Sequence, residues 1–470
     1  MSEKVIIIVV TWNKKDYVLN LISQLYEKVK YPEYDILIVD NASNDGTEKA
    51  VTSKFKEVIY IKNEENLGGT GGFNTGLKFV LNNTGKYKYI WLLDNDVELI
   101  NDPLSPAIEI LKNNKNIGVV GSSILSQENK EIITEIGGLI VKKNRILGNC
   151  KGRKLNECNE IYEVDYVASC SAFLKVKVLE KVGIWDDYYF IYFDDVDFFW
   201  RIKNEGYKII ATKKSIVSHP DFVEKSNIFG GYYYMRNSFY FFLKKYKLGK
   251  LSAISFFKYK VFYIVFDLIR GDKKNFIAMT KAIENYFKGE RGKSLWIEIF
   301  LKQTEHKSNF KKKLDLKRID KIVFSYSTKF RELEKFYKEL KKKNPFIRVF
   351  FLSDIGRKGL INTIGDIEII VVDFNKKWET LKKFFTLLFK EKVKFIFSFK
   401  GAFGNFLFKY RVFEKGGIFF FEKNRRFSKW LKFIFVFPIL FTFYFLKYNL
   451  LYILGYPNND KQNINNNSNL

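Results

Sequence analysis

The chain has 470 residues, of which 47% are hydrophobic and 18% aromatic, and its formal net charge is +28. This length predicts two or three domains of about 150 residues each, with ample apolar content for packed cores. The positive charge predicts attraction to polyanions, a class that includes nucleic acid, anionic lipids and phosphorylated substrates. Three cysteines without a CxxC pair, beside two histidines, exclude a zinc finger. The odd, sparse cysteine count also favours thiols in a reducing cytosol over a disulfide scaffold.

The N-terminal part alternates between strand and helix patterns. An apolar, β-branched run at 5–10 is too short for the core of a signal peptide and predicts a first strand. The elements expected after it are a helix at 16–28, a strand at 35–41, a helix at 45–54, a strand at 58–63, a helix at 73–82 and a strand at 89–96. Such alternation predicts a mainly parallel sheet with helices on both faces and a ligand site at the carboxyl ends of its strands.

The rest of the chain divides by composition. Residues 121–219 carry irregular strand-like pieces, residues 226–310 are helical, aromatic and basic, and residues 320–424 restart the strand–helix alternation. The segment after Tyr456 is polar and of low complexity. We therefore expect an α/β domain at 1–225, a helical extension at 226–315, a Rossmann-like α/β domain at 316–456 and a disordered tail at 457–470.

A pair of aspartates, Asp94 and Asp96, follows the apolar strand at 89–96. In an extended chain, residues two apart point the same way, so the two carboxylates would repel each other unless a positive charge lay between them. Oxygen ligands suit a hard divalent cation, Mn²⁺ or Mg²⁺, shared with phosphate groups. The alternative is a surface turn capped by Asn and Asp.

A second acidic cluster lies in FDDVDFFWR, where Asp194, Asp195 and Asp197 stand among aromatic residues. Apolar surroundings raise the pKa of a carboxyl group, which suits a general base near neutral pH. The alternative is a helix start, with Arg201 as the i+4 partner of Asp197; this fits Asp197 better than Asp195. His219, at a strand end before proline, is either structural or a third metal ligand.

The segment NLGGTGGFNTGL, residues 66–77, holds five glycines. It does not match the dinucleotide fingerprint, because Asn74 stands where the third glycine is needed and the run follows a later strand. The chain also lacks a phosphate-binding P-loop, since Phe287 occupies the first glycine position ahead of Gly292. A slack linker is one interpretation. We favour a surface where the backbone passes close to a ligand before turning into a helix.

Six motifs occur in the order and approximate spacing of family 2 glycosyltransferases, which have the GT-A fold: VVTWN, VDNASNDGT, NLGGTGGFNTGL, WLLDNDV, FIYFDDVDFFWR and SHP. The chain resembles this family over about residues 1–300. The glycine run and the YYYMRN segment are most similar to rhamnosyltransferases and galactofuranosyltransferases. The resemblance implies inverting transfer of a hexose-type sugar from a UDP- or dTDP-linked donor. The implied acceptor is a hydroxyl of a glycan or lipid-linked molecule in cell-envelope polysaccharide or glycoconjugate synthesis.

The same resemblance implies roles for individual residues. Asp94 and Asp96 correspond to the DxD motif that holds Mn²⁺ or Mg²⁺ on the diphosphate, and His219 to the later histidine ligand. Asp195 takes the position of the catalytic base, while Asp194 stands where glutamate is common, which leaves the choice within the pair open. The residues implied in donor binding are Thr11, Asn13, Asp40, Asn66, Gly69, Asn74, Asp94 and Asn95, with Asp40 near a pyrimidine base.

The most hydrophobic stretch lies near the C-terminus. Between Lys432 and Lys447 there are 14 uncharged residues, which as a helix would span about 21 Å, short of the ~30 Å hydrocarbon core of a bilayer. Basic residues precede this stretch, and we expect 430–454 to attach peripherally to an anionic membrane surface on its cytoplasmic face. A buried core helix is the alternative. The domain at 316–456 is similar to half of a GT-B glycosyltransferase, and we assign it no catalysis.

Other classes of function compete with this interpretation. A non-catalytic envelope-assembly scaffold could keep a GT-A fold, although it would not need Asp94, Asp96, Asp195 and His219 together. The high charge suggests a nucleic-acid binder, but no helix-turn-helix, RNP or zinc signature supports one, and we expect no nucleic-acid partner. A nucleotidyltransferase would require a glycine-rich phosphate loop after the first strand, which this chain lacks.

Overall fold

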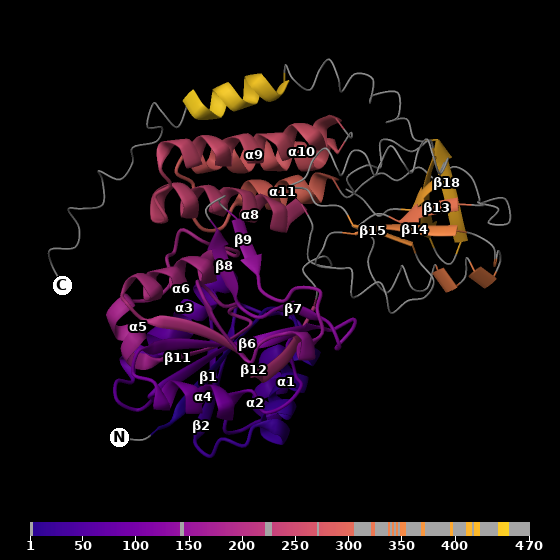
Figure 1. Ribbon diagram of the computed structural model, residues 1–470. Coiled ribbons are helices and arrows are strands. Elements are labelled where there is room, and N and C mark those ends of the chain that lie inside the picture. The colour runs from indigo at the N-terminus through magenta and orange to yellow at the C-terminus, as the bar shows by residue number, and fades with distance from the viewer. Residues whose placement is uncertain are drawn as a thin grey trace. The chain divides into compact units, whose positions relative to one another are not determined.

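The computed structural model describes residues 3–141, 145–220, 228–269 and 272–304, together with short pieces of the C-terminal part (Figure 1). Those pieces are residues 321–324, 337–338, 341–342, 345, 348–353, 368–371, 395–397, 410–415, 418–423 and 440–450. The chain divides into two compact units. Unit 1 holds residues 1–225, 237–247 and 291–294, and unit 2 holds residues 226–236, 248–290 and 295–470.

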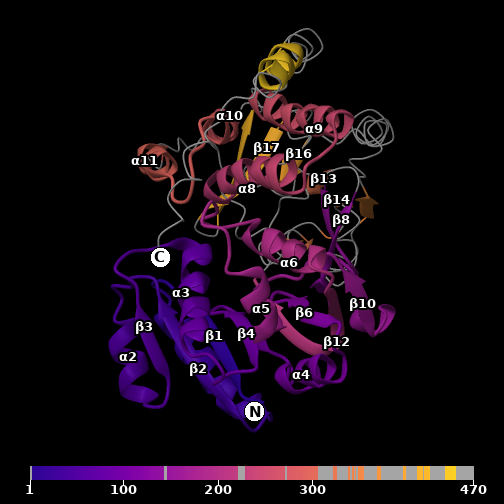
Figure 2. The same ribbon diagram turned by 90° about the vertical axis from the view of Figure 1, so that its left-hand side faces the viewer.

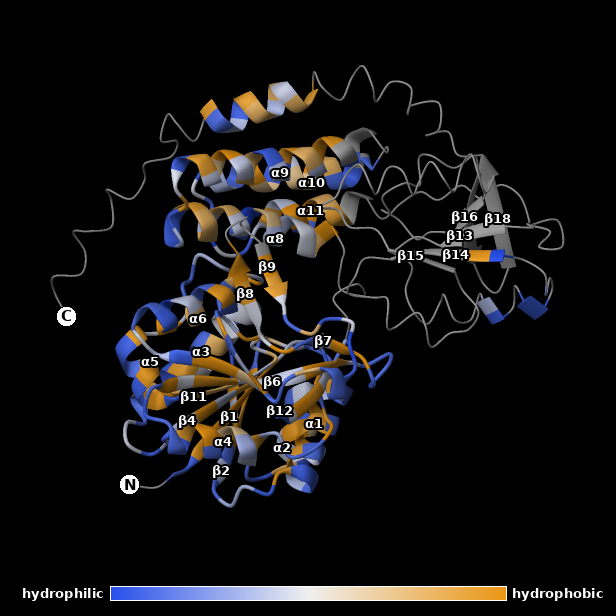
Figure 3. Cartoon of the chain, viewed as in Figure 1, coloured by the Kyte–Doolittle hydropathy of each residue, from blue (hydrophilic) through white to orange (hydrophobic). Residues whose placement is uncertain are grey.

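A large sheet forms the centre of unit 1. Its strands are β1 (Val5–Thr11), β2 (Tyr34–Asp40), β3 (Ile59–Lys62), β4 (Tyr89–Asp94), β5 (Glu98–Leu99), β6 (Ile117–Ser126), β7 (Ile133–Glu135), β10 (Ile161–Val164), β11 (Ser171–Lys175) and β12 (Lys208–His219). Their order is β10-β12-β6-β11-β4-β1-β2-β3, with β5 paired to β12 and β7 paired to β6. Figure 3 shows several of these strands as hydrophobic, as expected for strands covered on both faces.

The sheet is mixed: its N-terminal half is entirely parallel, whereas the other half combines parallel and antiparallel pairs. Strands β3, β2, β1 and β4 run parallel, side by side, as the strand–helix alternation predicted (Figure 2). Strand β11 is antiparallel to both of its neighbours, β4 and β6, whereas β12 is again parallel to β6. A parallel connection needs a crossover, commonly a helix. The chain between β6 and β11 contains short strands and a hairpin in place of a crossover helix, and β11 therefore runs antiparallel to β6.

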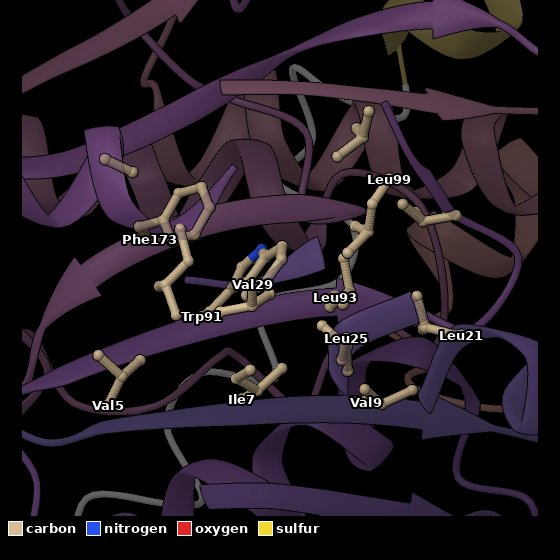
Figure 4. Packing of buried hydrophobic residues seen from close by; sticks show 14 of the residues in the cluster. Val5, Ile7, Val9, Leu21, Leu25, Val29, Trp91, Leu93, Leu99 and Phe173 are labelled. Atoms are coloured by element: carbon tan, nitrogen blue, oxygen red, sulfur yellow. The ribbon is translucent and has the colours of Figure 1, made fainter. Parts of the chain in front are cut away.

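Helices cover both faces of this sheet, which confirms the α/β fold class expected for this part of the chain. They are α1 (Lys15–Lys28), α2 (Thr47–Lys54), α3 (Gly68–Asn82), α4 (Leu104–Asn113), α5 (Val176–Val182) and α6 (Asp194–Asn204). Alternate residues of β1, namely Val5, Ile7 and Val9, join Leu25 and Trp91 in the core under α1 and α4 (Figure 4). The other face of the sheet lies against α3, α5 and α6.

A hairpin and a disulfide interrupt the second half of unit 1. The hairpin consists of β8 (Gly138–Val141) and β9 (Arg145–Gly148), and a short 3-10 helix, η1 (Leu155–Glu157), follows it. Cys150 and Cys158 form a disulfide, so the expectation that all three cysteines are thiols is wrong. Consecutive tight turns, in which Arg153 N donates to Cys150 O, bring the two cysteines together, and cysteine spacing alone does not reveal such turns. Cys170 is buried.

The region predicted to be a helical extension is helical where the structure describes it. Its elements are α8 (Ile228–Tyr240), the π-helix η2 (Phe241–Lys245), α9 (Lys250–Ile269), α10 (Lys273–Phe287) and α11 (Leu295–Thr304). Asp272 caps α10 by accepting a hydrogen bond from Asn275 N. Residues 440–450 are also helical, and the rest of 430–454 lies outside the described residues. No helix within the described ranges combines the length and the apolar character needed to cross a membrane.

A smaller sheet belongs to unit 2. Its described strands are β13 (Lys321–Phe324), β14 (Arg348–Ser353), β15 (Glu368–Val371), β16 (Phe395–Phe397), β17 (Tyr410–Lys415) and β18 (Ile418–Lys423), in the order β15-β14-β13-β16-β17-β18. All pair in parallel except β17 with β18. The order of the first five strands is that of a doubly wound sheet, in agreement with the Rossmann-like prediction. The expected helix from Trp378 and the expected disordered tail lie outside the described residues.

Candidate active site

The carboxyl ends of β4 and β12 bring two carboxylates and an imidazole together. Asp94 ends β4, Asp96 lies in the turn that follows, and His219 ends β12. His219 Nε2 lies 3.1 Å from Asp96 Oδ1 and 3.6 Å from Asp94 Oδ2. One ligand atom from each residue lies within 4.8 Å of the others. The structure therefore brings the three predicted metal ligands together, although His219 is far from the others in the sequence.

A glutamine that the motifs did not single out links the two strand ends. Gln127 Nε2 donates to the Asp96 carbonyl oxygen (2.6 Å), and Gln127 N donates to the His219 carbonyl oxygen (3.3 Å). On the other side of the turn, Asp94 N donates to Cys170 O (3.2 Å). These contacts fix the backbone on which the carboxylates and the imidazole stand. A lone glutamine after a strand carries no sequence pattern that would have predicted this role.

The Asp-Asp-His cluster fits a hard divalent cation. Two carboxylates and one neutral imidazole are ligands that Mn²⁺ accepts, and the carboxylates equally suit Mg²⁺. Neighbouring ligands around an octahedral ion lie roughly 3 Å apart, because each is about 2.1 Å from the ion. The 3.1 Å between His219 Nε2 and Asp96 Oδ1 matches that separation. Asp94, Asp96 and His219 would hold the ion.

Three residues predicted to bind the sugar donor form hydrogen bonds between adjacent strand ends. Asn95 Nδ2 donates to Thr11 Oγ1 (2.8 Å), which ties the turn after β4 to the end of β1. Asn13 N donates to Ser43 Oγ, and Asn13 Oδ1 accepts from Asn44 N, both at 2.8 Å. Asn13 has a φ of 49°, in the left-handed region that asparagine tolerates. The structure thus places Thr11, Asn13 and Asn95 at one edge of the sheet, as the strand ends predicted.

Asp40, at the end of β2, is fully buried. Its Oδ1 accepts a hydrogen bond from Ser43 N (2.9 Å), and its Oδ2 accepts one from the Tyr60 hydroxyl (2.8 Å). Burial and the hydrogen bond to Asp40 raise the pKa of Tyr60. Both carboxylate oxygens of Asp40 are engaged within the protein, so here Asp40 shapes the turn after β2. Its contact with a nucleobase stays a prediction.

The glycine-rich segment packs against the protein's own sheet. A Cβ at Gly72 would lie 2.4 Å from Val10 Cγ1, and a Cβ at Gly76 would lie 2.4 Å from Ile8 Cγ2. Both distances are far shorter than van der Waals contact, so these glycines allow α3 to approach β1 closely. The interpretation that the glycines make room for a ligand is therefore wrong for Gly72 and Gly76, because their close neighbours belong to β1.

The start of the same helix also differs from the prediction. Helix α3 begins at Gly68 rather than Phe73, so the glycines form its first turns. Gly68 has a φ of +72°, and a Cβ there would lie 2.1 Å from Phe190 O. Gly69 is more open, since the nearest atom to its Cβ position is Asp194 Oδ2, at 3.8 Å. Gly69, which the family resemblance assigned to the donor site, thus lies beside the second acidic cluster.

The two asparagines of this segment make contacts within the protein. Asn66 Oδ1 accepts a hydrogen bond from Gly68 N (2.9 Å) where α3 begins. Asn74 is buried, and its amide forms two hydrogen bonds with Trp185: Nδ2 donates to Trp185 O (3.0 Å), and Oδ1 accepts from Trp185 N (2.9 Å). Asn74 therefore fastens the segment before α6 to α3. Roles for Asn66 and Asn74 in donor binding stay predictions.

The carboxyl pair Asp194–Asp195 begins α6. Thr70 Oγ1, from α3, donates to Asp194 Oδ2 (2.8 Å), and Asp194 is buried. Asp195 Oδ1 accepts from Val196 N (2.8 Å), and its Oδ2 accepts a long hydrogen bond from Ser169 N (3.5 Å). Thr70, within the glycine run, was not predicted as a site residue. The Thr70 hydroxyl gives Asp194 a side-chain hydrogen-bond donor, so Asp195 has fewer side-chain contacts than Asp194.

Burial and neighbouring negative charges shift the titration of this pair. Burial raises the pKa of Asp194 to about 6, with a further contribution from the charge of Asp94. Burial raises the pKa of Asp195 well above its usual value, and the charges of Asp194 and Glu135 raise it further. A carboxylate with a raised pKa is a better proton acceptor near neutral pH. These shifts agree with the prediction that the pair contains a general base.

The third aspartate of the cluster has a structural role. Asp197 is fully buried, and Arg201 Nε donates to its Oδ2 at 3.1 Å, which confirms the predicted i+4 pair. The remaining guanidinium nitrogens of Arg201 donate to the carbonyl oxygens of Val182 and Ile184. This pair anchors α6 to the end of α5.

The YYYMRN segment supports the backbone just before the carboxyl pair. Asn237 Nδ2 donates to the carbonyl oxygens of Ile191 (2.8 Å) and Tyr192 (2.9 Å). Tyr192 and Phe193 have φ values of 67° and 69°, which bulky side chains rarely adopt. Such backbone strain persists only where surrounding contacts impose it, and it is common at functional sites. Asn237 was not predicted individually, although its segment contributed to the family resemblance.

Comparison with known proteins agrees with these features. Residues 6–183 match the family model described as "Glycosyl transferase family 2". The low-salt glycan biosynthesis hexosyltransferase Agl10 of Haloferax volcanii is 22% identical over 213 residues, covering 44% of this chain and 64% of that protein. The poly-beta-1,6-N-acetyl-D-glucosamine synthase of Staphylococcus epidermidis is 24% identical over 200 residues, covering 42% of this chain and 45% of that protein. The chain thus spans less than two thirds of either relative.

Among solved structures, the mannosyltransferase PcManGT from Pyrobaculum calidifontis, in complex with GDP-Man and Mn²⁺, is 17% identical with a TM-score of 0.38. That alignment covers 64% of this chain and 78% of the mannosyltransferase. The family match includes the strand ends of β1, β2 and β4 and stops before α6 and β12. By this match, residues 6–183 of the chain are similar to a family 2 glycosyltransferase domain.

Proposed function

We propose that the protein is an inverting, metal-dependent glycosyltransferase. It moves a hexose-type sugar from a UDP- or dTDP-linked donor to a hydroxyl of a glycan or lipid-linked acceptor. The observation that carries the proposal is the cluster of Asp94, Asp96 and His219, which is electrostatically coupled to the buried pair that contains Asp195. The names of the two curated relatives, a hexosyltransferase and a polysaccharide synthase, support a hexose-type donor and a glycan product.

In the proposed site, Asp94, Asp96 and His219 would hold the Mn²⁺ or Mg²⁺ that accompanies the donor. When bound, the cation supplies Lewis-acid stabilisation of the charge that develops on the leaving nucleoside diphosphate. The strand-end residues Thr11 and Asn13 lie at the same sheet edge, which suits contact with the nucleoside. A Cβ at Gly69 would meet only Asp194 Oδ2, at 3.8 Å, so the start of α3 lies next to this carboxyl group.

In the proposed reaction, Asp195 accepts the proton of the acceptor hydroxyl. The hydroxyl oxygen forms a bond to the anomeric carbon on the face opposite the diphosphate, and the bond from that carbon to the diphosphate oxygen breaks. The electron pair of the broken bond leaves with the diphosphate, so the anomeric configuration inverts. Thr70 holds Asp194 by a hydrogen bond, and we assign the proton transfer to Asp195, which has fewer contacts.

A non-catalytic scaffold with the same fold is the competing function. Burying carboxyl groups lowers stability unless a specific contact compensates for it. A scaffold would gain nothing from the raised pKa values of Asp194 and Asp195. It would equally have no use for two aspartates and a histidine within ligand distance of one another. Because a scaffold would carry the loss of stability from these buried carboxyl groups without any benefit, the arrangement favours an enzyme.

We also propose that the protein attaches peripherally to an anionic membrane surface on the cytoplasmic side, where a lipid-linked acceptor would be presented. The described helix 440–450 exposes Phe443, Leu446 and Leu450, which are 59%, 59% and 57% exposed. Their spacing of three and four residues places them on one face of a helix. An apolar face of this kind, in a stretch of sequence that basic residues precede, suits the interface of an anionic bilayer.

The experiment that tests this function uses purified protein, Mn²⁺ and a panel of nucleotide-sugars, with release of nucleoside diphosphate as the readout. Asp195→Asn should reduce turnover by about 10²–10⁴-fold, the usual worth of a general base, and leave donor affinity nearly unchanged. Asp16→Asn, at an exposed position in the first turn of α1, is the matched control. No release from any nucleotide-sugar would contradict the proposed function, and wild-type turnover in Asp195→Asn would contradict the assignment of the base.

A further inference from the structure

The disulfide between Cys150 and Cys158 lies between β9 and β10, and the proposed reaction does not use it. Cys150 is partly exposed, whereas Cys158 is 6% exposed. A thiol reductant would therefore reach Cys150 Sγ more easily than Cys158 Sγ. Disulfides in cytosolic proteins are usually transient, with catalytic or redox-sensing roles. A disulfide in a protein proposed to act at the cytoplasmic face of a membrane therefore calls for an explanation.

Polar groups lie beside both cysteines of the disulfide. The Tyr162 hydroxyl lies 3.0 Å from Cys150 Sγ and donates to it, since a disulfide sulfur carries no proton. Asn159 N donates to the same hydroxyl oxygen (2.9 Å) and so orients it. Lys213 Nζ donates to the carbonyl oxygen of Cys158 (3.1 Å), which brings a positive charge beside the second cysteine. Hydrogen-bond donors and positive charges favour the thiolate form of cysteine, so these surroundings assist opening of the disulfide.

The loop that the disulfide closes is strained and has space beside it. Cys150 has a φ of 56°, in the left-handed region that residues other than glycine rarely adopt. Such strain persists only where surrounding contacts impose it; here the contacts are the disulfide and the turn in which Arg153 N donates to Cys150 O (3.0 Å). Leu155 and Asn156, within the loop, line a cavity of about 540 Å³. Opening the disulfide would therefore let the loop relax into free space.

Backbone hydrogen bonds join the disulfide-closed loop to β7. Gly152 N donates to Ile133 O (2.8 Å), and Ile133 N donates to Arg153 O (2.9 Å). Next to them, Lys154 and Ile132 form an antiparallel bridge. Ile133 is the first residue of β7. The start of β7 therefore depends for its position on the loop that the disulfide closes.

The turn between β6 and β7 connects this pairing with the proposed metal site. Ser126 N donates to Ile132 O (2.9 Å), which closes the turn. The next residue, Gln127, donates through Nε2 to Asp96 O (2.6 Å) and through N to His219 O (3.3 Å). Partners that hold metal ligands in place without touching the metal are worth about 10–100-fold in metal affinity. A displacement at Ile132 thus acts on the backbone of two proposed metal ligands through consecutive hydrogen bonds.

We propose that the Cys150–Cys158 disulfide is a redox site, and that its reduction by a dithiol weakens the binding of a divalent cation at the Asp-Asp-His cluster. This proposal rests on the proposed function and names a regulation of its metal site. One thiolate of the dithiol attacks Cys150 Sγ, the bond between the two cysteine sulfurs breaks, and Cys158 leaves as a thiolate that takes up a proton. The second thiolate of the dithiol then attacks the mixed disulfide and releases Cys150. The dithiol is oxidised to a disulfide, and the protein gains two electrons and two protons.

The test measures Mn²⁺ binding to the full chain from the electron paramagnetic resonance signal of the unbound ion, a readout that does not depend on activity. Wild type is titrated as the disulfide, after reduction with dithiothreitol, and after reoxidation with oxidised glutathione, and each reagent is removed before the titration. Thiol titration of denatured samples reports the redox state. The variant carrying both Cys150→Ser and Cys158→Ser has an open loop without thiols. Cys170→Ser is the matched control, because Cys170 lies outside the disulfide.

Reduction of wild type should raise the Kd for Mn²⁺ about tenfold, the lower end of the range for partners of metal ligands, and reoxidation should restore it. The double serine variant should bind Mn²⁺ as weakly as reduced wild type and respond to neither reagent. Cys170→Ser should respond as wild type does. Gln127→Met should bind Mn²⁺ weakly in both redox states, because the link between the loop and the metal site is removed.

Hydrogen exchange locates the change within the protein. On reduction, the amides of Gly152 and Ile133 should exchange faster, since the loop to which they belong or bond is released. Amides of β1 and β2 should keep their protection, and the circular dichroism spectrum should stay unchanged. This pattern distinguishes local opening of the loop from unfolding of the whole domain.

Equal Mn²⁺ affinity in oxidised and reduced wild type would overturn the proposal. So would a disulfide that dithiothreitol leaves intact in the folded protein, or a loss of the circular dichroism signal on reduction. Absence of Mn²⁺ binding in every state would overturn this proposal together with the proposed metal site. Redox-dependent Mn²⁺ binding without nucleoside diphosphate release from any nucleotide-sugar would contradict the proposed function alone. If the double serine variant did not fold, wild type and Gln127→Met would still decide the outcome.

Discussion

The close packing of α3 on β1 gives a sharp prediction about the glycine run. In Gly72→Ala, the new Cβ would lie 2.4 Å from Val10 Cγ1 and 2.9 Å from Asn41 Nδ2. Overpacking of a core costs about 1–3 kcal/mol, and alanine favours a helix over glycine by about 1 kcal/mol. Gly69→Ala is the matched control in the same helix, since its Cβ would meet only Asp194 Oδ2, at 3.8 Å. The difference between the two variants largely removes the helix term and leaves the overpacking term.

Differential scanning fluorimetry of the two variants measures this difference. A loss of 2 kcal/mol corresponds to about 4–8 °C in Tm for a domain of this size, so Gly72→Ala should melt that much below Gly69→Ala. Donor affinity should be unchanged in Gly72→Ala. Equal melting temperatures with weakened nucleotide-sugar binding in Gly72→Ala would refute the argument, because the glycine would then make room for the ligand and not for β1.

The remaining predictions concern pH, a buried amide and the membrane. With saturating Mn²⁺, kcat/KM should fall as the pH is lowered, because Asp195 must lose its proton before it can act as the base. The midpoint of this fall should lie well above the ordinary carboxyl pKa of about 4, since the pKa of Asp195 is raised. A midpoint at the ordinary value would contradict the assignment of Asp195 as the base. Asn74→Ala should lower the free energy of unfolding by about 1–3 kcal/mol, since it leaves buried groups of Trp185 unpaired; a loss of donor affinity at unchanged stability would favour the predicted donor contact instead. Replacing Phe443 and Leu446 by serine should reduce co-sedimentation with phosphatidylglycerol vesicles, and undiminished binding would remove this helix from membrane attachment.

Much of the site could be predicted because its residues end strands. In a sheet with a parallel half, polar residues after β1, β2 and β4 converge at one edge, so Asp94 and Asp96 could be expected near Thr11 and Asn13. His219 could be added because it ends another strand-like segment. The chain alternation also predicted β1 to β4 correctly, since a clear helical pattern follows each of β1, β2 and β3.

Tertiary contacts decided the features that the sequence did not reveal. Which way Asn74 points depends on Trp185, whose backbone engages its amide, and no local pattern encodes that pairing. The orientation of Asp40 similarly depends on the Tyr60 hydroxyl. A glycine run has the same composition whether a ligand or a strand approaches it, so the packing of Gly72 on β1 could not be read from the motif. Pairing of β11 against β4 likewise reflects the path of the chain.

The most direct test of the account is nucleoside diphosphate release from a panel of nucleotide-sugars, measured in EDTA and again after addition of excess Mn²⁺. The account predicts that EDTA abolishes release by wild type and that Mn²⁺ restores it, whereas Asp96→Asn stays inactive at the same Mn²⁺ concentration because one of the three ligands is lost. Full activity in EDTA, or wild-type activity in Asp96→Asn, would contradict the assignment of Asp94, Asp96 and His219 as the metal site.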